Sequence, residues 1–119
     1  TSFGNIVKPN SSKVCELDST GIHPTDCAEN DSAMVGLLLI TGIPNKRITV
    51  SGTTTSSDGI TYTPMFGKGG KKYTKIYKVL LDQKGEAIAE IGGVIALDPS
   101  KMMFGKKTIT PTTITVLYD

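Results

Sequence analysis

The sequence has no tryptophan, a single histidine and only two cysteines among its 119 residues. The histidine, His23, has no second metal ligand near it in the chain, so we interpret it as a loop residue rather than as a zinc ligand or a catalytic base. No serine stands in the Gly-x-Ser-x-Gly turn of many hydrolases, and no Gly-x-x-x-x-Gly-Lys-Ser/Thr phosphate loop is present. These absences argue against an enzyme and against a resident metal or cofactor.

Long apolar runs and a strong charge surplus are missing as well. The longest strongly apolar stretch, residues 33–40, is far below the roughly 20 residues that a membrane-spanning helix needs, so no membrane span is expected. The net charge of +2 is too small to indicate a nucleic-acid or membrane partner. One lysine-rich segment has two possible interpretations. It could form a basic aromatic platform for a nucleic-acid strand, or its lysines could be solvated and protect a sheet edge, and we favour the second interpretation. The residues concerned are Lys68, Lys71, Lys72, Lys75 and Lys78, with Tyr73 and Tyr77.

Threonine and serine are abundant, with 16 Thr and 9 Ser making up about a fifth of the chain. Together with 13 Gly and 6 Pro, this composition is typical of short strands joined by turns. Strands recurring at this density predict one domain, residues 1–119, with an all-β sandwich fold. The candidate strands are residues 3–7, 13–17, 33–41, 47–51, 60–66, 73–82, 86–97 and 112–118.

Three of these segments carry more specific predictions. Residues 33–41 are almost continuously apolar, which favours a strand covered on both faces over a short helix. In residues 47–51, Ile48 and Val50 are predicted to point inward and Thr49 outward. Residues 86–97 begin with a pattern that also suits a helix, and their Gly-Gly pair indicates a bulge or a close backbone approach. If this segment is a strand, its two glutamates are charges at the rim rather than a glycosidase pair.

Cys15 and Cys27 are separated by eleven residues rich in turn formers. An even count with this spacing predicts one disulfide that closes a local loop, with two buried free thiols in a cytosolic domain as the alternative. A disulfide implies the periplasm, the cell surface or the medium. No charged and apolar leader opens the chain, which we interpret as a mature, processed form.

The two ends of the chain carry the most specific pattern. The last residues, Thr-Ile-Thr-Val-Leu-Tyr-Asp, form an alternating strand with a penultimate tyrosine, and Gly105 lies shortly upstream. This pattern resembles the C-terminus of chaperone–usher pilus subunits, in which the glycine stands one position closer to the end. Other segments resemble a branch of uncharacterised fimbria-like bacterial domains. They are residues 2–7 with a Phe-Gly step, 40–50 with a Thr-Gly-x-Pro-Asn turn, 91–97 with a Gly-Gly pair, and 113–118.

The resemblance implies an immunoglobulin-like β-sandwich that is incomplete and is completed by a donor strand. It also implies a non-enzymatic structural subunit of a bacterial pilus or fimbria, located in the periplasm in transit and then at the cell surface. A periplasmic chaperone would lend the missing strand, and a neighbouring subunit of a homopolymer would later replace it. Such subunits carry a donor extension ahead of the Phe-Gly step, where this chain has only Thr1 and Ser2. Either the extension was removed, as we expect, or the subunit accepts a strand and donates none.

The resemblance also assigns site residues. Ile114, Val116 and Tyr118 on the last strand, with Phe3 and Ile6 on the first, would line the donor-strand groove. Tyr118 and the C-terminal Asp119 would contact the chaperone. The alternative interpretation is a self-contained cell-surface adhesin or carbohydrate-binding sandwich, which would bind a host glycan or receptor through loops such as residues 53–59 or 67–72.

Overall fold

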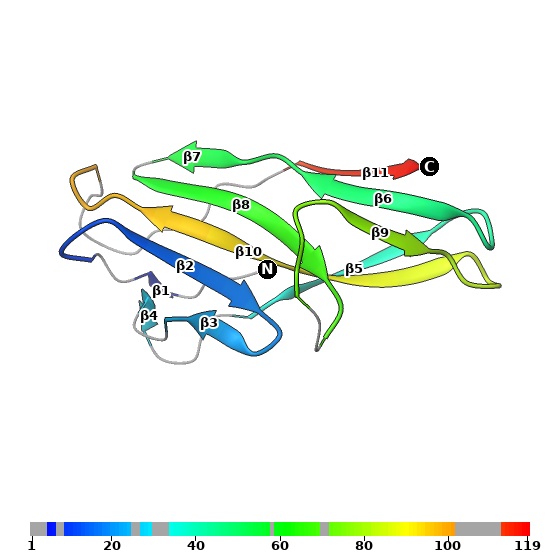
Figure 1. Cartoon of the computed structure of the whole chain (residues 1–119), viewed down its shortest axis with the longest axis horizontal. Coiled ribbons are helices and arrows are strands. Elements are labelled where there is room, and N and C mark those ends of the chain that lie inside the picture. The colour runs from blue at the N-terminus through cyan, green and yellow to red at the C-terminus, as the bar shows by residue number, and fades with distance from the viewer. Residues whose placement is uncertain are drawn as a thin grey trace.

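The computed structural model describes residues 5–6, 9–24, 27–29, 34–57, 59–69, 72–101 and 113–119. These residues contain eleven strands and no α-helix (Figure 1). The strands are β1 (Asn5–Ile6), β2 (Lys13–Asp18), β3 (Gly21–His23), β4 (Ala28–Glu29), β5 (Gly36–Thr41), β6 (Arg47–Gly52), β7 (Thr55–Ser57), β8 (Ile60–Gly67), β9 (Tyr77–Leu80), β10 (Glu86–Leu97) and β11 (Ile114–Tyr118).

The strands form two main antiparallel sheets. The larger sheet has the order β3-β2-β10-β8-β7, and β5 also pairs with β10. The smaller sheet has the order β11-β6-β9, and β1 pairs with β4 beside the larger sheet. The predicted all-β sandwich is therefore confirmed. Phe3, Lys71 and Gly105, which the sequence analysis singled out, lie outside the described residues.

Strand β10 is the longest strand and the centre of the larger sheet. Along one edge it pairs with β5 through residues 86–91 and with β2 through residues 93–97. Along the other edge it pairs with β8 through residues 90–97 in an unbroken register. The segment is therefore a strand throughout. Its Gly-Gly pair marks a close backbone approach, since a Cβ on Gly92 would overlap the carbonyl oxygen of Leu17.

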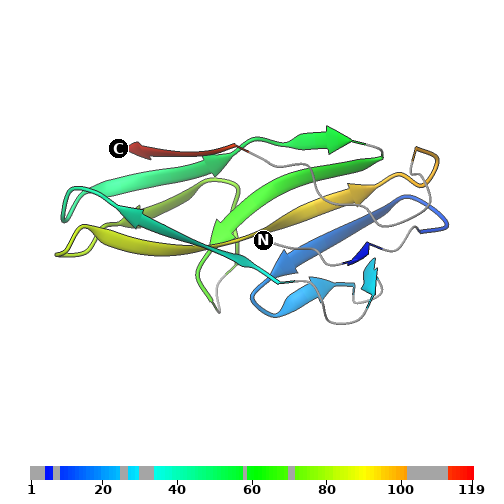
Figure 2. The same cartoon turned by 180° about the vertical axis from the view of Figure 1, so that it is seen from behind.

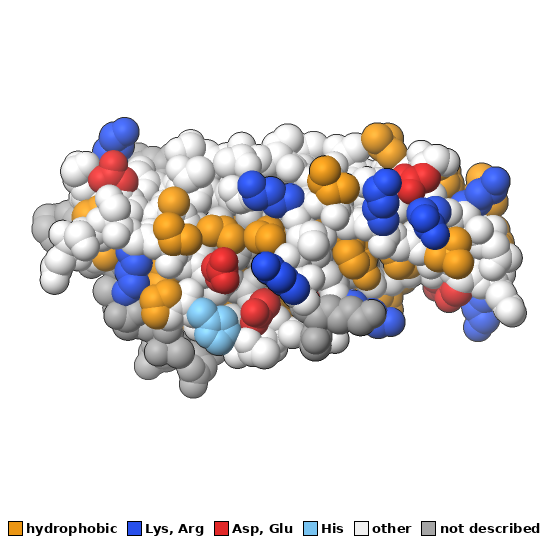
Figure 3. Space-filling view, viewed as in Figure 1, with side chains coloured by type: hydrophobic (Ala, Val, Ile, Leu, Met, Phe, Trp, Pro, Cys, Tyr) orange, Lys and Arg blue, Asp and Glu red, His pale blue; other side chains and the backbone are white. Residues whose placement is uncertain are grey.

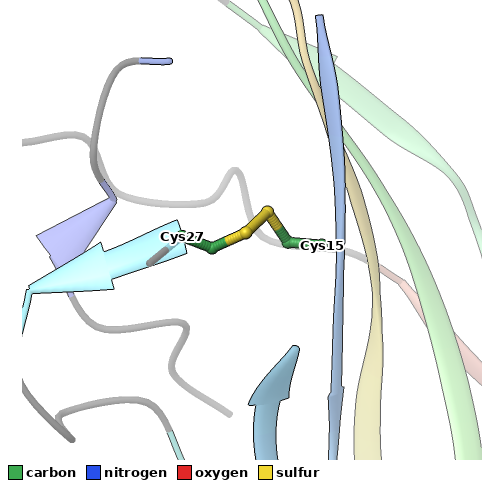
Figure 4. Close-up of a disulfide and its surroundings, with 2 residues drawn as sticks. All are labelled: Cys15 and Cys27. Carbon is green, nitrogen blue, oxygen red and sulfur yellow. A yellow bond between two sulfur atoms is a disulfide. The ribbon is translucent and has the colours of Figure 1, made fainter. Parts of the chain in front are cut away.

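Two hydrophobic clusters lie along the molecule, and both include residues of β10. The disulfide core is made of Cys15, Leu17, Ile22, Cys27, Ile60, Tyr62, Ile95 and Leu97. The sheet–sheet core is made of Ile40, Ile48, Val50, Phe66, Leu81 and Ile91. The predicted disulfide is present, with a Cα–Cα distance of 6.3 Å between Cys15 and Cys27 (Figure 4). It links β2 to the residue before β4 within the first cluster.

The prediction that the apolar run 33–41 is covered on both faces is wrong. Leu38 and Ile40 of β5 pack against the sheet–sheet core, but Leu37 and Leu39 are 72% and 61% exposed. The cause is the position of β5. Its inner face packs against Ile48 and Val50 of the smaller sheet, whereas its outer face is open to solvent. Runs of large apolar residues therefore do not imply burial on two sides in this chain.

Two further segments differ from their predicted extents. The candidate strand 73–82 forms β9 only over its second half. Tyr73 is buried against the positions of Gly67 and Gly92, and Thr74 donates a hydrogen bond of 2.8 Å from its hydroxyl to the carbonyl of Ile76, which bends the chain. The polar connection 53–59 contains the short strand β7, which pairs with β8.

Replacing Gly92 with alanine tests the close approach of β10 and β2. The new methyl group would meet backbone rather than a movable side chain, so we expect Gly92→Ala to lower the free energy of unfolding by about 2 kcal/mol or more. Gly69→Ala is the matched control, because the nearest atom to its Cβ is 3.5 Å away at a glutamate side chain. Urea denaturation measures both, and equal effects of the two variants would contradict the proposed clash.

Removing the disulfide tests how far it stabilises the first cluster. Its loop spans 12 positions, and closure of such a loop restricts the unfolded chain. We expect Cys15→Ala/Cys27→Ala to lower the free energy of unfolding by about 3 kcal/mol in urea denaturation. The exposed Ser12→Ala just before β2 is the control and should leave stability unchanged.

Candidate functional site

Strand β11 forms an edge of the smaller sheet. It pairs with β6 along one side, and no other described strand pairs with it. The register places Val116 opposite Val50 and Tyr118 opposite Ile48. Because Ile48 and Val50 belong to the sheet–sheet core, residues Ile114, Val116 and Tyr118 face the inside of the sandwich.

The inner face of β11 is nevertheless open to solvent. Ile114 is half-buried against the core, but Val116 and Tyr118 are 39% and 54% exposed. Their partners on β6 are completely buried. In a closed sandwich the inward residues of both sheets are covered by the facing sheet. Among the described residues, the sandwich is therefore incompletely covered along β11, which runs at the upper edge in Figure 2. This uncovered inner face and free edge of β11 is the candidate site.

The end of the site is fixed by contacts of the last two residues. The Tyr118 hydroxyl accepts a hydrogen bond of 3.0 Å from the backbone N–H of Ile43, which follows β5. The Asp119 N–H donates to the carbonyl of Arg47 at 3.0 Å, and its carboxylate accepts a hydrogen bond from the Thr49 hydroxyl. These contacts place the end of β11 next to the turn between β5 and β6. Strand β5 is therefore the edge strand of the larger sheet beside the opening.

The structure brings together only part of the predicted groove. Ile114, Val116 and Tyr118 lie on one face of β11, as the alternation predicts. Ile6 lies in β1, which pairs with β4 through Ile6 and Ala28, so the structure does not place it beside β11. The end of β11 contacts the turn that follows β5, through Tyr118 and Ile43, where the sequence analysis had expected the first strand. The alternation of β5 was concealed because its central residues, 37–40, are large and apolar on both faces.

The remaining candidate residues do not assemble a reactive centre. His23 is exposed in β3, where its Nε2 lies 2.7 Å from the Thr20 hydroxyl and 3.5 Å from the Asp18 carboxylate. Burial alone would raise the pKa of Asp18, but hydrogen bonds from Thr20 lower it below the usual value. The described residues contain no group of three potential metal ligands. The described residues also contain no helix that is long and apolar enough to cross a membrane.

The lysine-rich segment before β9 does not form an aromatic platform. Lys68, Lys72, Lys75 and Lys78 are exposed. Tyr73 is buried, however, and Tyr77 packs against the sheet–sheet core. Neither ring is therefore presented for stacking on a base.

Comparison with known proteins adds no relative. The chain matches no protein-family model, no curated protein and no solved structure at a significant level. What is established is the class of the molecule, an all-β sandwich with one disulfide and an uncovered edge strand. Its function is inferred below from that geometry.

Two buried tyrosines should make the stability depend on alkaline pH. Burial raises the pKa of Tyr62 to about 12. Burial, and then the hydrogen bond of 2.9 Å that Tyr73 donates to Glu90, raise the pKa of Tyr73 to about 12. The unfolded chain releases these protons near the usual tyrosine pKa of about 10, so the stabilising effect is complete below that pH. It is lost as the pH rises from about 10 to about 12.

Urea denaturation across this pH range measures the effect. We expect the free energy of unfolding to fall steadily above about pH 10, and Tyr73→Phe to reduce the slope. Tyr77→Phe is the control, because Tyr77 is only half-buried. A flat profile for the unmodified protein would contradict the assignment.

Proposed function

We propose that this chain is a non-enzymatic structural subunit of a bacterial pilus or fimbria, completed by a strand donated along β11. A periplasmic chaperone would supply this strand first, and a neighbouring subunit would then replace it. The observation that carries the proposal is the exposure of Val116 and Tyr118 although both face inward on an edge strand. Solvent at this place is costly, and an apolar guest strand would remove it.

An added strand fits the chemistry of this edge. The free backbone groups of β11 would form a ladder with the guest, while its alternate side chains would cover Ile114, Val116 and Tyr118. Protected edge strands usually carry lysine, proline or a bulge that prevents such pairing. Strand β11, with the sequence Ile-Thr-Val-Leu-Tyr, has none of these features over its length. An edge so poorly protected is expected either to aggregate or to be occupied.

Two other features agree with this proposal. The disulfide suits an oxidising compartment such as the periplasm. Next to Tyr118, the Asp119 side-chain carboxylate lies at the end of β11 on the outer face of the smaller sheet, beside Thr49 and Lys78. A basic chaperone cleft would find a negative group there. Assembly at the cell surface would follow when a subunit strand displaces the chaperone strand.

A tethered strand tests the proposal. We would append to Asp119 a flexible Gly/Ser linker and a segment of about nine residues that alternates valine with threonine. A tether raises the effective concentration to the millimolar range, so a weak intrinsic affinity suffices. We expect the melting temperature to rise by about 5 °C or more relative to the same linker without the strand.

Two matched variants of β11 show whether the strand binds the predicted face. Val116→Thr places a hydroxyl on the inner face, and Leu117→Thr places the same group on the outer face. We expect the first to remove most of the gain from the tethered strand, because a buried hydroxyl without a partner costs about 1–3 kcal/mol. The second should leave the gain intact. Equal effects of the two variants, or a tethered strand without any effect, would refute the proposal.

A further inference from the structure

A second opening lies on the side of the sandwich away from β11. It is a groove of about 600 Å³ between β9 and the first half of β10. The groove exists because β8 pairs with β10 only from residue 90 onward, so residues 86–89 have no β8 partner on that edge. Its walls include Leu37, Leu39 and Ile88, and its carboxylates are Asp82, Glu86 and Glu90, with Lys68 at the rim.

The outer face of β5 and β10 beside this groove combines apolar and acidic groups. Leu39 is opposite Ile88, and the neighbouring pairs place Glu90 opposite Leu37 and Glu86 opposite Thr41. Leu37, Leu39 and Ile88 are each more than half exposed. Glu86 and Glu90 flank Ile88 on the same face of β10, separated by about 13 Å of strand. We call these five residues, Leu37, Leu39, Glu86, Ile88 and Glu90, the acidic face.

The outer face of the smaller sheet has the opposite charge. Its register places Thr49 between Leu117 and Lys78, and Arg47 opposite Leu80. Figure 3 shows hydrophobic side chains interleaved with lysine and arginine over β6 and β9. Asp119 lies 3.9 Å from Lys78 and offsets part of this charge, while Arg47 forms no ion pair with another described residue. We call Arg47, Ile76, Lys78, Leu80 and Leu117 the basic face.

We propose that the acidic face of one copy of this chain binds the basic face of another copy. Glu86 and Glu90 would pair with Arg47 and Lys78, while the leucines and isoleucines between them would be buried against each other. The two faces are different surfaces of one domain, so the contact is head-to-tail. Each copy keeps one free face of each kind, and the association continues as a row rather than closing as a dimer.

A second copy is the occupant that the chemistry favours. The described residues include eleven exposed large hydrophobic side chains, and six of them lie on these two faces. Such concentration is typical of interaction surfaces rather than of ordinary exposed residues. On both faces, charged side chains alternate with apolar ones. The two faces carry charges of opposite sign, so they are electrostatically complementary. This inference does not rest on the proposed pilus function, because the donor strand would use the inner face and free edge of β11.

Sedimentation velocity of the unmodified protein over a concentration series gives the first test. We expect reversible association at ~50 mM NaCl, with an apparent dissociation constant that rises about tenfold or more at ~500 mM, because salt screens the exposed charges. A protein that stays monomeric at low salt and high concentration would overturn the inference. So would association that salt leaves unchanged.

Charge reversal on single faces gives a sharper test. Glu86→Lys alters the acidic face and Arg47→Glu alters the basic face, and each variant alone should be monomeric. When the two variants are mixed, the intact acidic face of Arg47→Glu can bind the intact basic face of Glu86→Lys. We therefore expect one-to-one dimers that grow no further, a result that only a head-to-tail contact gives. Lys101→Glu, an exposed reversal far along the chain from both faces, is the control and should associate like the unmodified protein.

The outcomes separate this inference from the proposed function. Higher assemblies in the mixture, or no association in it, would overturn the head-to-tail contact. Circular dichroism confirms that each variant is folded. If the tethered strand has no effect, the donor-strand proposal is rejected. If association is nevertheless sensitive to salt and is abolished in each reversal variant alone, the head-to-tail contact stands.

Discussion

Both hydrophobic clusters of this domain depend on β10. Its second half carries Ile95 and Leu97 into the disulfide core, and Ile91 in the middle joins the sheet–sheet core. The strand changes neighbours along one edge, from β5 to β2, near the Gly-Gly pair. A side chain there would collide with the backbone of β2, so the glycines allow three strands to meet at this point. Strands β2, β5 and β8 each pair with it directly.

The limited reach of the strands next to β10 explains both openings. Strand β8 pairs with β10 only as far as Glu90, so residues 86–89 have no partner on that edge, and this leaves the groove between β9 and β10. On the other side, β11 extends the smaller sheet beyond what the larger sheet covers, and its inward side chains stay exposed. The groove between β9 and β10 has an acidic rim, whereas the inner face of β11 carries no charged side chain. The two therefore suit different partners, an apolar strand in one case and a charged surface in the other.

Much of the fold could be predicted from local pattern. The alternation in residues 47–51 identified the inward Ile48 and Val50, and the spacing of Cys15 and Cys27 indicated their disulfide. The exposed side of β5 could not be predicted, because a run of leucines has no polar residue to mark its outer face. The late start of β9, at Tyr77 rather than at Tyr73, could not be predicted either. It depends on how the ring of Tyr73 packs against β10. Of the candidate site, the sequence predicted the inner face of β11 but not β5 as its neighbour, which is a long-range contact.

The disulfide divides the molecule into halves with different tolerance for rearrangement. It lies wholly within the cluster formed around β2, whereas the other cluster is held by noncovalent packing alone. Local opening is easier where fewer constraints hold the chain together. Local opening is therefore expected to begin in the half that contains both openings, because the disulfide restrains the half around β2. One end of the domain therefore carries a covalent constraint that the other end lacks.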